Sequence, residues 1–193
     1  IIGVVFCVFF TAIAHLAIKI SLPTDYALGR KTPWGYFSYV NNLFQCLNEE
    51  FIFRALLLNF LLSLGLGKWK VVLIPALVFS LLHWCFYSFN YLPENRGSVN
   101  FSALMTLFLF GFSTGIIFIK TRSIMIPLAL HCGWNFNRFS MGIFKIDAPQ
   151  EQISEYLSFN LLEGSDTVFI LCLGLAICSY LICEGKITIF HKR

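Results

Sequence analysis

The residues best suited to chemistry in this sequence lie within apolar segments, where charged side chains are costly and usually functional. Two adjacent carboxylates, Glu49 and Glu50, are followed by Arg54. On a helix Glu50 and Arg54, four residues apart, share one face, with the glutamate on the favoured N-terminal side. We predict that this pair is structural. Glu49 is rotated by about 100° from Glu50 on a helix, which leaves it available for catalysis. Alternatively, both glutamates serve only an ion-pair network between helices.

Two further apolar segments contribute histidine and asparagine. His83 follows Phe79 by one helical turn, and His131 and Asn135 project from the same face of another helix because they are four residues apart. A lone histidine in a membrane helix often acts only as a hydrogen-bonding group between helices. His131 and Asn135 need a shared polar partner, and Gly133 between them permits close approach of a helix or a substrate backbone.

A polar stripe leads along the second predicted helix toward Glu49. It consists of amide side chains at helical spacing: Asn41, Asn42, Gln45 and Asn48. We expect water to reach Glu49 along this stripe.

Intramembrane hydrolysis needs a nucleophile, a base that activates it, and donors for the developing oxyanion. The zinc motif H-E-x-x-H is absent. The aspartates Asp25, Asp147 and Asp166 lie in predicted loops, which excludes an aspartyl dyad within the membrane. The remaining candidates are glutamate, histidine and asparagine side chains: Glu49, Glu50, His83, His131 and Asn135.

The segment from Gly111 to Gly115 reads G-F-S-T-G and matches the G-x-S-x-G pattern of serine hydrolases. That nucleophile requires a strand before the serine, whereas an apolar helix is predicted here. The same glycines form G-x-x-x-G, a pattern of close helix packing. We therefore predict a packing role for this segment.

Apolar helices must position all of these residues. The chain has 193 residues, of which 58% are hydrophobic and 12% charged, too apolar for a single soluble core of this size. Segments close to the length that spans a bilayer recur at 1–20, 55–66, 71–87, 101–119, 123–144 and 167–183. The second helix is expected to begin earlier, near Gly35. We predict an all-α bundle of about six membrane helices, and a single domain over residues 1–193, because no internal repeat is visible.

The distribution of charged residues and cysteines restricts the possible binding partners and the orientation of the chain in the membrane. The net charge is +4 without any aromatic and basic stripe, which argues against nucleic-acid binding. The seven cysteines form no C-x-x-C pair and are interpreted as small core or lipid-facing residues. Lysine and arginine at alternate helix ends weakly place the C-terminus in the cytoplasm. Because the chain begins with Ile1 rather than methionine, we expect that the start is trimmed.

Three motifs occur in order on three predicted membrane helices: E-E-x-x-x-R at Glu49, Glu50 and Arg54, F-x-x-x-H at Phe79 and His83, and H-x-x-x-N at His131 and Asn135. They resemble the motifs of the CPBP family over residues 35–144. This family includes CAAX prenyl endopeptidases of the Rce1 type and bacterial proteins linked to bacteriocin self-immunity and peptide maturation. The resemblance implies a helical membrane protease in which Glu49 and His83 activate water. His131 and Asn135 then hold the oxyanion or, in an older view, help to bind zinc.

The expected function is intramembrane endopeptidase activity on a membrane-associated protein or peptide, either CAAX-type or a leader or bacteriocin precursor, in the bacterial cytoplasmic membrane. A non-catalytic immunity or peptide-binding protein is the main alternative, and a transporter is a second one. We favour a route without metal, because Glu49 cannot be both zinc ligand and base, and Glu50 is engaged with Arg54. If zinc is present, its ligands are expected to be Glu49, His83 and His131.

Overall fold

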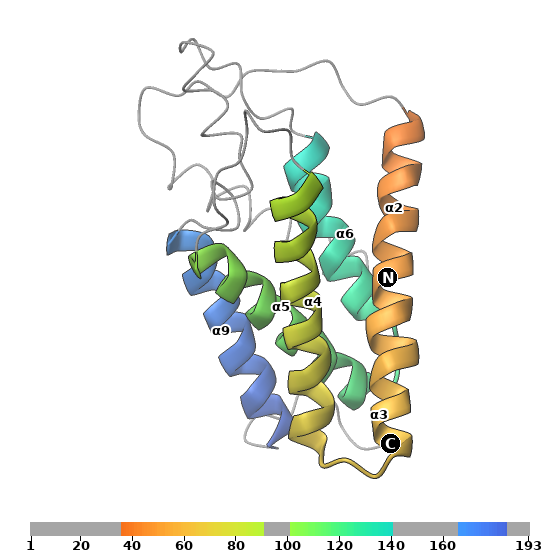
Figure 1. The fold of residues 1–193 in the computed structure, drawn as a ribbon, viewed down its shortest axis with the longest axis vertical. Coiled ribbons are helices and arrows are strands. Elements are labelled where there is room, and N and C mark those ends of the chain that lie inside the picture. Colours follow the sequence, from red (N-terminus) through yellow and green to blue (C-terminus); the bar gives the residue numbers. More distant parts are fainter. Residues whose placement is uncertain (1–35, 91–100, 141–165, 185–193) are drawn as a thin grey trace.

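The computed structural model describes residues 36–90, 101–140 and 166–184, and every element in these ranges is a helix (Figure 1). In chain order the elements are α2 (Tyr36–Glu50), η1 (Phe51–Leu58), α3 (Asn59–Ser63), α4 (Lys68–Asn90), α5 (Phe101–Thr121), α6 (Met125–Ser140) and α9 (Asp166–Cys183). The prediction of an all-α fold is therefore confirmed for the described residues.

The helices α2, η1 and α3 form one continuous rod. Backbone angles remain helical across both junctions, at Glu50 (φ −63°, ψ −37°) and at Leu58 (φ −65°, ψ −44°). No glycine or proline interrupts residues 36–63, and the rod ends before Gly65, whose positive φ of 71° suits a helix C-terminus. The long second helix predicted to begin near Gly35 is thus present, but the π-helical turns of η1, directly after Glu50, were not predicted.

Helix α5 is the central element of the bundle. It packs against α4 and α9 most extensively, and it also contacts α6 and η1, while α2 packs against α6 (Figure 1). A Cβ atom at Gly111 would lie 3.2 Å from the Cα of Ala76, and one at Gly115 would lie 3.2 Å from Cγ1 of Val72. The predicted packing role of the G-x-x-x-G segment agrees with this close approach of α5 to α4.

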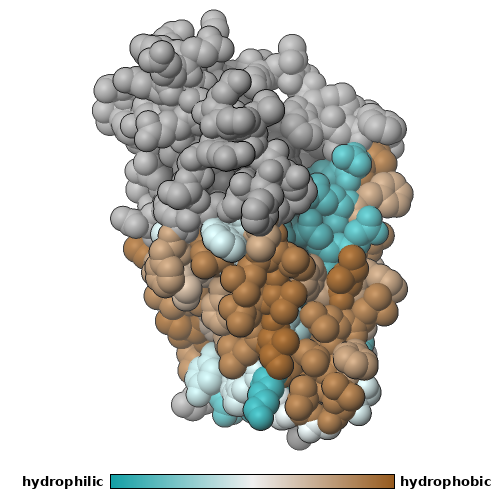
Figure 2. All heavy atoms as spheres, in the orientation of Figure 1, coloured by the Kyte–Doolittle hydropathy of each residue, from teal (hydrophilic) through white to brown (hydrophobic). Residues whose placement is uncertain are grey.

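The outer surface of the described helices is strongly apolar (Figure 2). Large apolar side chains are exposed along the rod and α4, among them Leu56, Phe60, Leu73 and Leu77. A surface of this kind needs cover from lipid or from another protein. By length and composition, Lys68–Cys85 and Phe101–Thr121 are able to cross a membrane, and Phe169–Cys183 is a shorter apolar helix.

The number of spans therefore stays a prediction. The segments expected at 71–87, 101–119 and 167–183 correspond to α4, α5 and α9. The expected segment 123–144 corresponds to α6, within its described residues. Asp166, expected in a loop, begins α9. The first expected span, Asp25, Asp147 and the tail after residue 184 lie outside the described residues, so the cytoplasmic position of the C-terminus also stays a prediction.

The close approach of α5 to α4 predicts that a branched side chain at Gly111 destabilises the bundle. Gly111→Val should lower the free energy of unfolding in detergent by about 1–3 kcal/mol, because the added atoms would meet the backbone of α4. The matched control is Gly174→Val on α9, where a Cβ atom would meet nothing within 4 Å. Equal melting temperatures for the two variants would contradict tight packing at Gly111.

Candidate active site

Three separate elements bring the motif residues together. Glu49 lies at the end of α2, His83 on α4 and His131 on α6. The Oε2 atom of Glu49 is 3.7 Å from Nε2 of His83 and 3.7 Å from Nε2 of His131. This oxygen is buried and accepts no hydrogen bond from the described residues. One carboxylate oxygen thus faces two imidazole rings inside the bundle.

Glu50 points to a different side of the rod, as its rotation from Glu49 predicts. Its Oε2 atom lies 3.1 Å from Nε of Arg54, so the predicted ion pair is formed. Both side chains are almost fully buried, with 0% of Glu50 and 2% of Arg54 exposed. The second oxygen, Oε1, accepts a hydrogen bond from Nδ1 of His131 at 2.9 Å. Glu50 therefore orients His131, a contact that the sequence did not indicate.

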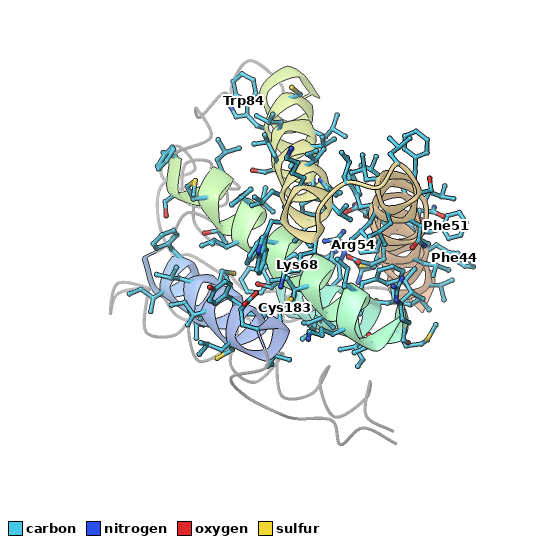
Figure 3. The ribbon with its side chains drawn as sticks, turned by 90° about the horizontal axis from the view of Figure 1, so that it is seen from below. Phe44, Phe51, Arg54, Lys68, Trp84 and Cys183 are labelled. Carbon is cyan, nitrogen blue, oxygen red and sulfur yellow. The ribbon has the colours of Figure 1, made fainter. Side chains whose placement is uncertain are left out.

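Arg54 extends this network to the central helix. Its Nη2 donates to Oγ1 of Thr114 on α5, and its guanidinium carbon lies 5.0 Å from the centre of the Phe79 ring. In a view along the bundle, Arg54 points toward the interior, whereas Phe44 and Phe51 on the same rod point outward (Figure 3). A buried cation is thus matched by an anion, a hydroxyl group and an aromatic face.

Phe79 supports His83 in two ways. Its carbonyl oxygen accepts a hydrogen bond from Nδ1 of His83 at 2.8 Å, and the two ring centres are 4.3 Å apart. The same aromatic ring packs edge-on against Phe53 at 5.2 Å and lies 6.2 Å from the ring of His131. The F-x-x-x-H spacing therefore fixes the tautomer and the ring plane of His83.

Both imidazole rings are held in the same manner. Nδ1 of His83 donates to a carbonyl oxygen and Nδ1 of His131 donates to a carboxylate, so that Nε2 of each ring faces Glu49. When such a ring is neutral, Nε2 carries a lone pair, and it becomes a second donor only when both nitrogens are protonated. The site therefore presents groups that can exchange protons around one point.

Asn135 is buried, but its contact differs from the expected partner shared with His131. Its Nδ2 donates to Sγ of Cys46 at 3.2 Å, and Sγ lies 3.8 Å from Oδ1 of Asn42. Cys46 and Asn42 precede Glu50 on the face of α2 that packs against α6. The sequence predicts only a small core or lipid-facing residue at Cys46, so this polar contact with Asn135 was not predicted.

The amide stripe on α2 is partly exposed. Asn41, Gln45 and Asn48 are accessible, whereas Asn42 is buried. Gln45 donates to Oε1 of Glu49 at 3.2 Å. Figure 2 shows a hydrophilic patch on the upper α2 side, above a largely apolar middle band. Glu49 is thus connected to polar residues at the surface, in agreement with the predicted stripe.

Within the described ranges, no three His, Cys, Asp or Glu side chains are arranged as a metal-binding group. The expected zinc ligands, Glu49, His83 and His131, have oxygen-to-nitrogen distances of 3.7 Å. Two atoms bonded to one tetrahedral zinc ion at usual bond lengths are about 3.3 Å apart. The Nδ1 contacts of both rings resemble those that orient zinc-bound histidines, so these three residues are the ones that would hold a zinc ion.

The buried ion pair predicts a large loss of stability when one partner is removed. Glu50→Gln and Arg54→Ala should each lower the free energy of unfolding by about 3–5 kcal/mol, because each leaves a charge buried without its counterion. Lys68→Ala is the control, since Lys68 contacts Glu184 at 2.7 Å in an exposed pair and such pairs contribute little. Denaturant titration in detergent checks this, and unchanged stability of the Glu50 and Arg54 variants would refute the structural role.

A family model described as type II CAAX prenyl endopeptidase Rce1-like matches residues 31–137. This range is more than half of the chain and includes every motif residue from Glu49 to Asn135. Comparison with curated proteins and with solved structures gives no match. The family and the two long apolar helices together indicate an integral membrane protein. The chain belongs to the Rce1-like family of type II CAAX prenyl endopeptidases.

Proposed function

We propose that this chain is an intramembrane endopeptidase that hydrolyses a peptide bond in a membrane-associated protein or peptide. The observation that carries the proposal is the convergence of Glu49 Oε2 on the Nε2 atoms of His83 and His131, at 3.7 Å each. This separation is too long for a direct hydrogen bond, and we propose that a small opening between these groups admits the water that is consumed in the hydrolysis. The family assignment supports protease activity of the CAAX type.

In the proposed reaction, Glu49 and His83 orient and activate that water. Its oxygen attacks the carbonyl carbon of the substrate, and Glu49 accepts the proton that the water loses. The new carbon–oxygen bond forms a tetrahedral intermediate with a negatively charged oxygen. Collapse of this intermediate breaks the carbon–nitrogen bond, and the proton held by Glu49 passes to the departing amine. A carboxylate and a water molecule are therefore sufficient for a balanced hydrolysis.

His131 and Asn135 are proposed to stabilise the intermediate as hydrogen-bond donors. Because Nδ1 of His131 donates to Glu50, His131 donates through Nε2 only in its doubly protonated form. Asn135 gives one amide hydrogen to Cys46 and has a second for the oxyanion. The two donors are thus oriented by different partners, His131 by Glu50 and Asn135 by Cys46.

The proposed substrate is a membrane-anchored peptide of the CAAX type, with leader peptides or bacteriocin precursors as the alternative. The proposed location is a bacterial cytoplasmic membrane, with the C-terminus in the cytoplasm. Mass spectrometry of membrane peptides from cells that express the chain or its Glu49→Gln variant would identify cleavage products. A farnesylated, internally quenched peptide with a CAAX terminus in lipid vesicles provides the direct assay.

The main alternative is a protein that binds such a peptide without cutting it. The same polar residues could hold a peptide backbone, as in an immunity protein. Binding of the farnesylated peptide without any product would favour this alternative. Product formation that depends on Glu49 would favour the protease.

Glu49→Gln should abolish cleavage while the protein still folds and inserts. Glutamine keeps the size of the side chain but cannot accept the proton from water, and loss of a general base typically lowers the rate by about 10²–10⁴-fold. Asn59→Ala is the control, since Asn59 is an exposed amide residue on the same rod that donates to the carbonyl oxygen of Ala55. Near-normal turnover by Glu49→Gln would exclude Glu49 as the base.

Catalysis is expected to need no metal ion. Elemental analysis of purified active protein should find no stoichiometric zinc, and exhaustive chelation should leave turnover unchanged. Zinc at one equivalent, with activity lost on chelation and restored by zinc alone, would assign Glu49, His83 and His131 as ligands instead.

A further inference from the structure

Thr114 is a buried hydroxyl residue on α5, outside the three family motifs. No part of its side chain is exposed. Its Oγ1 donates to the carbonyl oxygen of Phe110 at 2.8 Å and accepts a hydrogen bond from Nη2 of Arg54. Because the hydroxyl hydrogen is used within α5, the oxygen is oriented as an acceptor toward the guanidinium.

The glycines on either side explain how Thr114 reaches Arg54. Gly111 and Gly115 have no side chains, so α5 approaches α4 to within van der Waals contact at Ala76 and Val72. A Cβ atom at Gly115 would also lie 3.8 Å from Cδ1 of Leu58, on the rod that carries Arg54. Close packing thus places one polar group of the central helix against the buried cation.

Arg54 has few other polar contacts to hold it. Its Nε is paired with Glu50, and Nη1 has no hydrogen-bond partner among the described residues. The rings of Phe53 and Phe79 face the guanidinium at 5.9 Å and 5.0 Å, but they provide no directional hydrogen bond. Within the described bundle, Thr114 is the residue that fixes the end of the guanidinium opposite to Glu50.

A series of contacts links Thr114 to the candidate catalytic centre. Thr114 holds Arg54, Arg54 pairs with Glu50, and Glu50 accepts the hydrogen bond of His131. We propose that Thr114 is a positioning residue, which acts through Arg54 and Glu50 to hold Nε2 of His131 toward Glu49. This inference rests on the proposed peptidase function and adds α5 to the elements that build the site.

The test compares hydroxyl deletion with hydroxyl retention. Thr114→Val removes the oxygen at nearly constant shape, and Thr114→Ser keeps it. We expect Thr114→Val to lower kcat on the farnesylated peptide by roughly 10- to 100-fold, since displacement of a catalytic group by about 1 Å can cost about 100-fold. KM should change little, because the lost alignment affects the transition state. Thr114→Ser should keep most of the activity.

Ser113→Ala is the matched control. Ser113 is a buried neighbour whose Oγ donates only within α5, to the carbonyl oxygen of Leu109 at 2.7 Å. Its loss should leave kcat unchanged. If Thr114→Val does not insert, Thr114→Ala removes the same oxygen with fewer steric demands. Wild-type kcat in the hydroxyl-free variant, or equal losses in the valine and serine variants, would overturn the proposal.

A second readout does not depend on peptidase activity. Nitrogen NMR of histidine-labelled protein in detergent reports the hydrogen bond at Nδ1 of His131. Thr114→Val should shift this resonance, whereas Ser113→Ala should not. An unchanged resonance would overturn the positioning role, whether or not the wild-type chain cleaves the peptide. Absence of Glu49-dependent cleavage would instead refute the proposed function.

Discussion

One buried ion pair links the helices that build the candidate site. Glu50 and Arg54 are withdrawn almost completely from solvent, and isolated charges in such surroundings are very costly. Several polar and aromatic groups around them offset part of that cost. Arg54 meets Thr114 and the face of Phe79, and Glu50 meets His131. Since these partners come from three other helices, α4, α5 and α6, the pair connects the rod to each of them.

The pair also separates two adjacent carboxylates into different environments. Glu50 contacts a cation and a histidine, while Glu49 faces two Nε2 atoms and an amide from Gln45. In the proposed mechanism, one glutamate is structural and its neighbour is available to exchange protons. A similar division of roles between carboxylates is common in hydrolases, where the surroundings of each group decide its function.

The parts of this site that depend on spacing along one helix could be predicted from the sequence. The Glu50–Arg54 pair, the turn between Phe79 and His83, and the shared face of His131 and Asn135 all follow from a repeat of nearly four residues. Contacts between helices were missed, namely Thr114 with Arg54, Glu50 with His131, and Cys46 with Asn135. Spacing within a segment gives no information about which helices become neighbours or how they are rotated.

The π-helical turns of η1 were missed for a different reason, because Phe51–Leu58 contains ordinary helix-forming residues. A π-turn contains more residues than an α-turn, so each side chain advances by a smaller angle around the axis. Within η1, Phe51 and Ile52 point to the exterior while Phe53, Arg54 and Leu58 are buried. The π-helical turns therefore change the rotation of the side chains about the helix axis between the first and second halves of the rod. The polar half before Glu50 and the apolar half after Arg54 can each keep the rotation that suits its own neighbours.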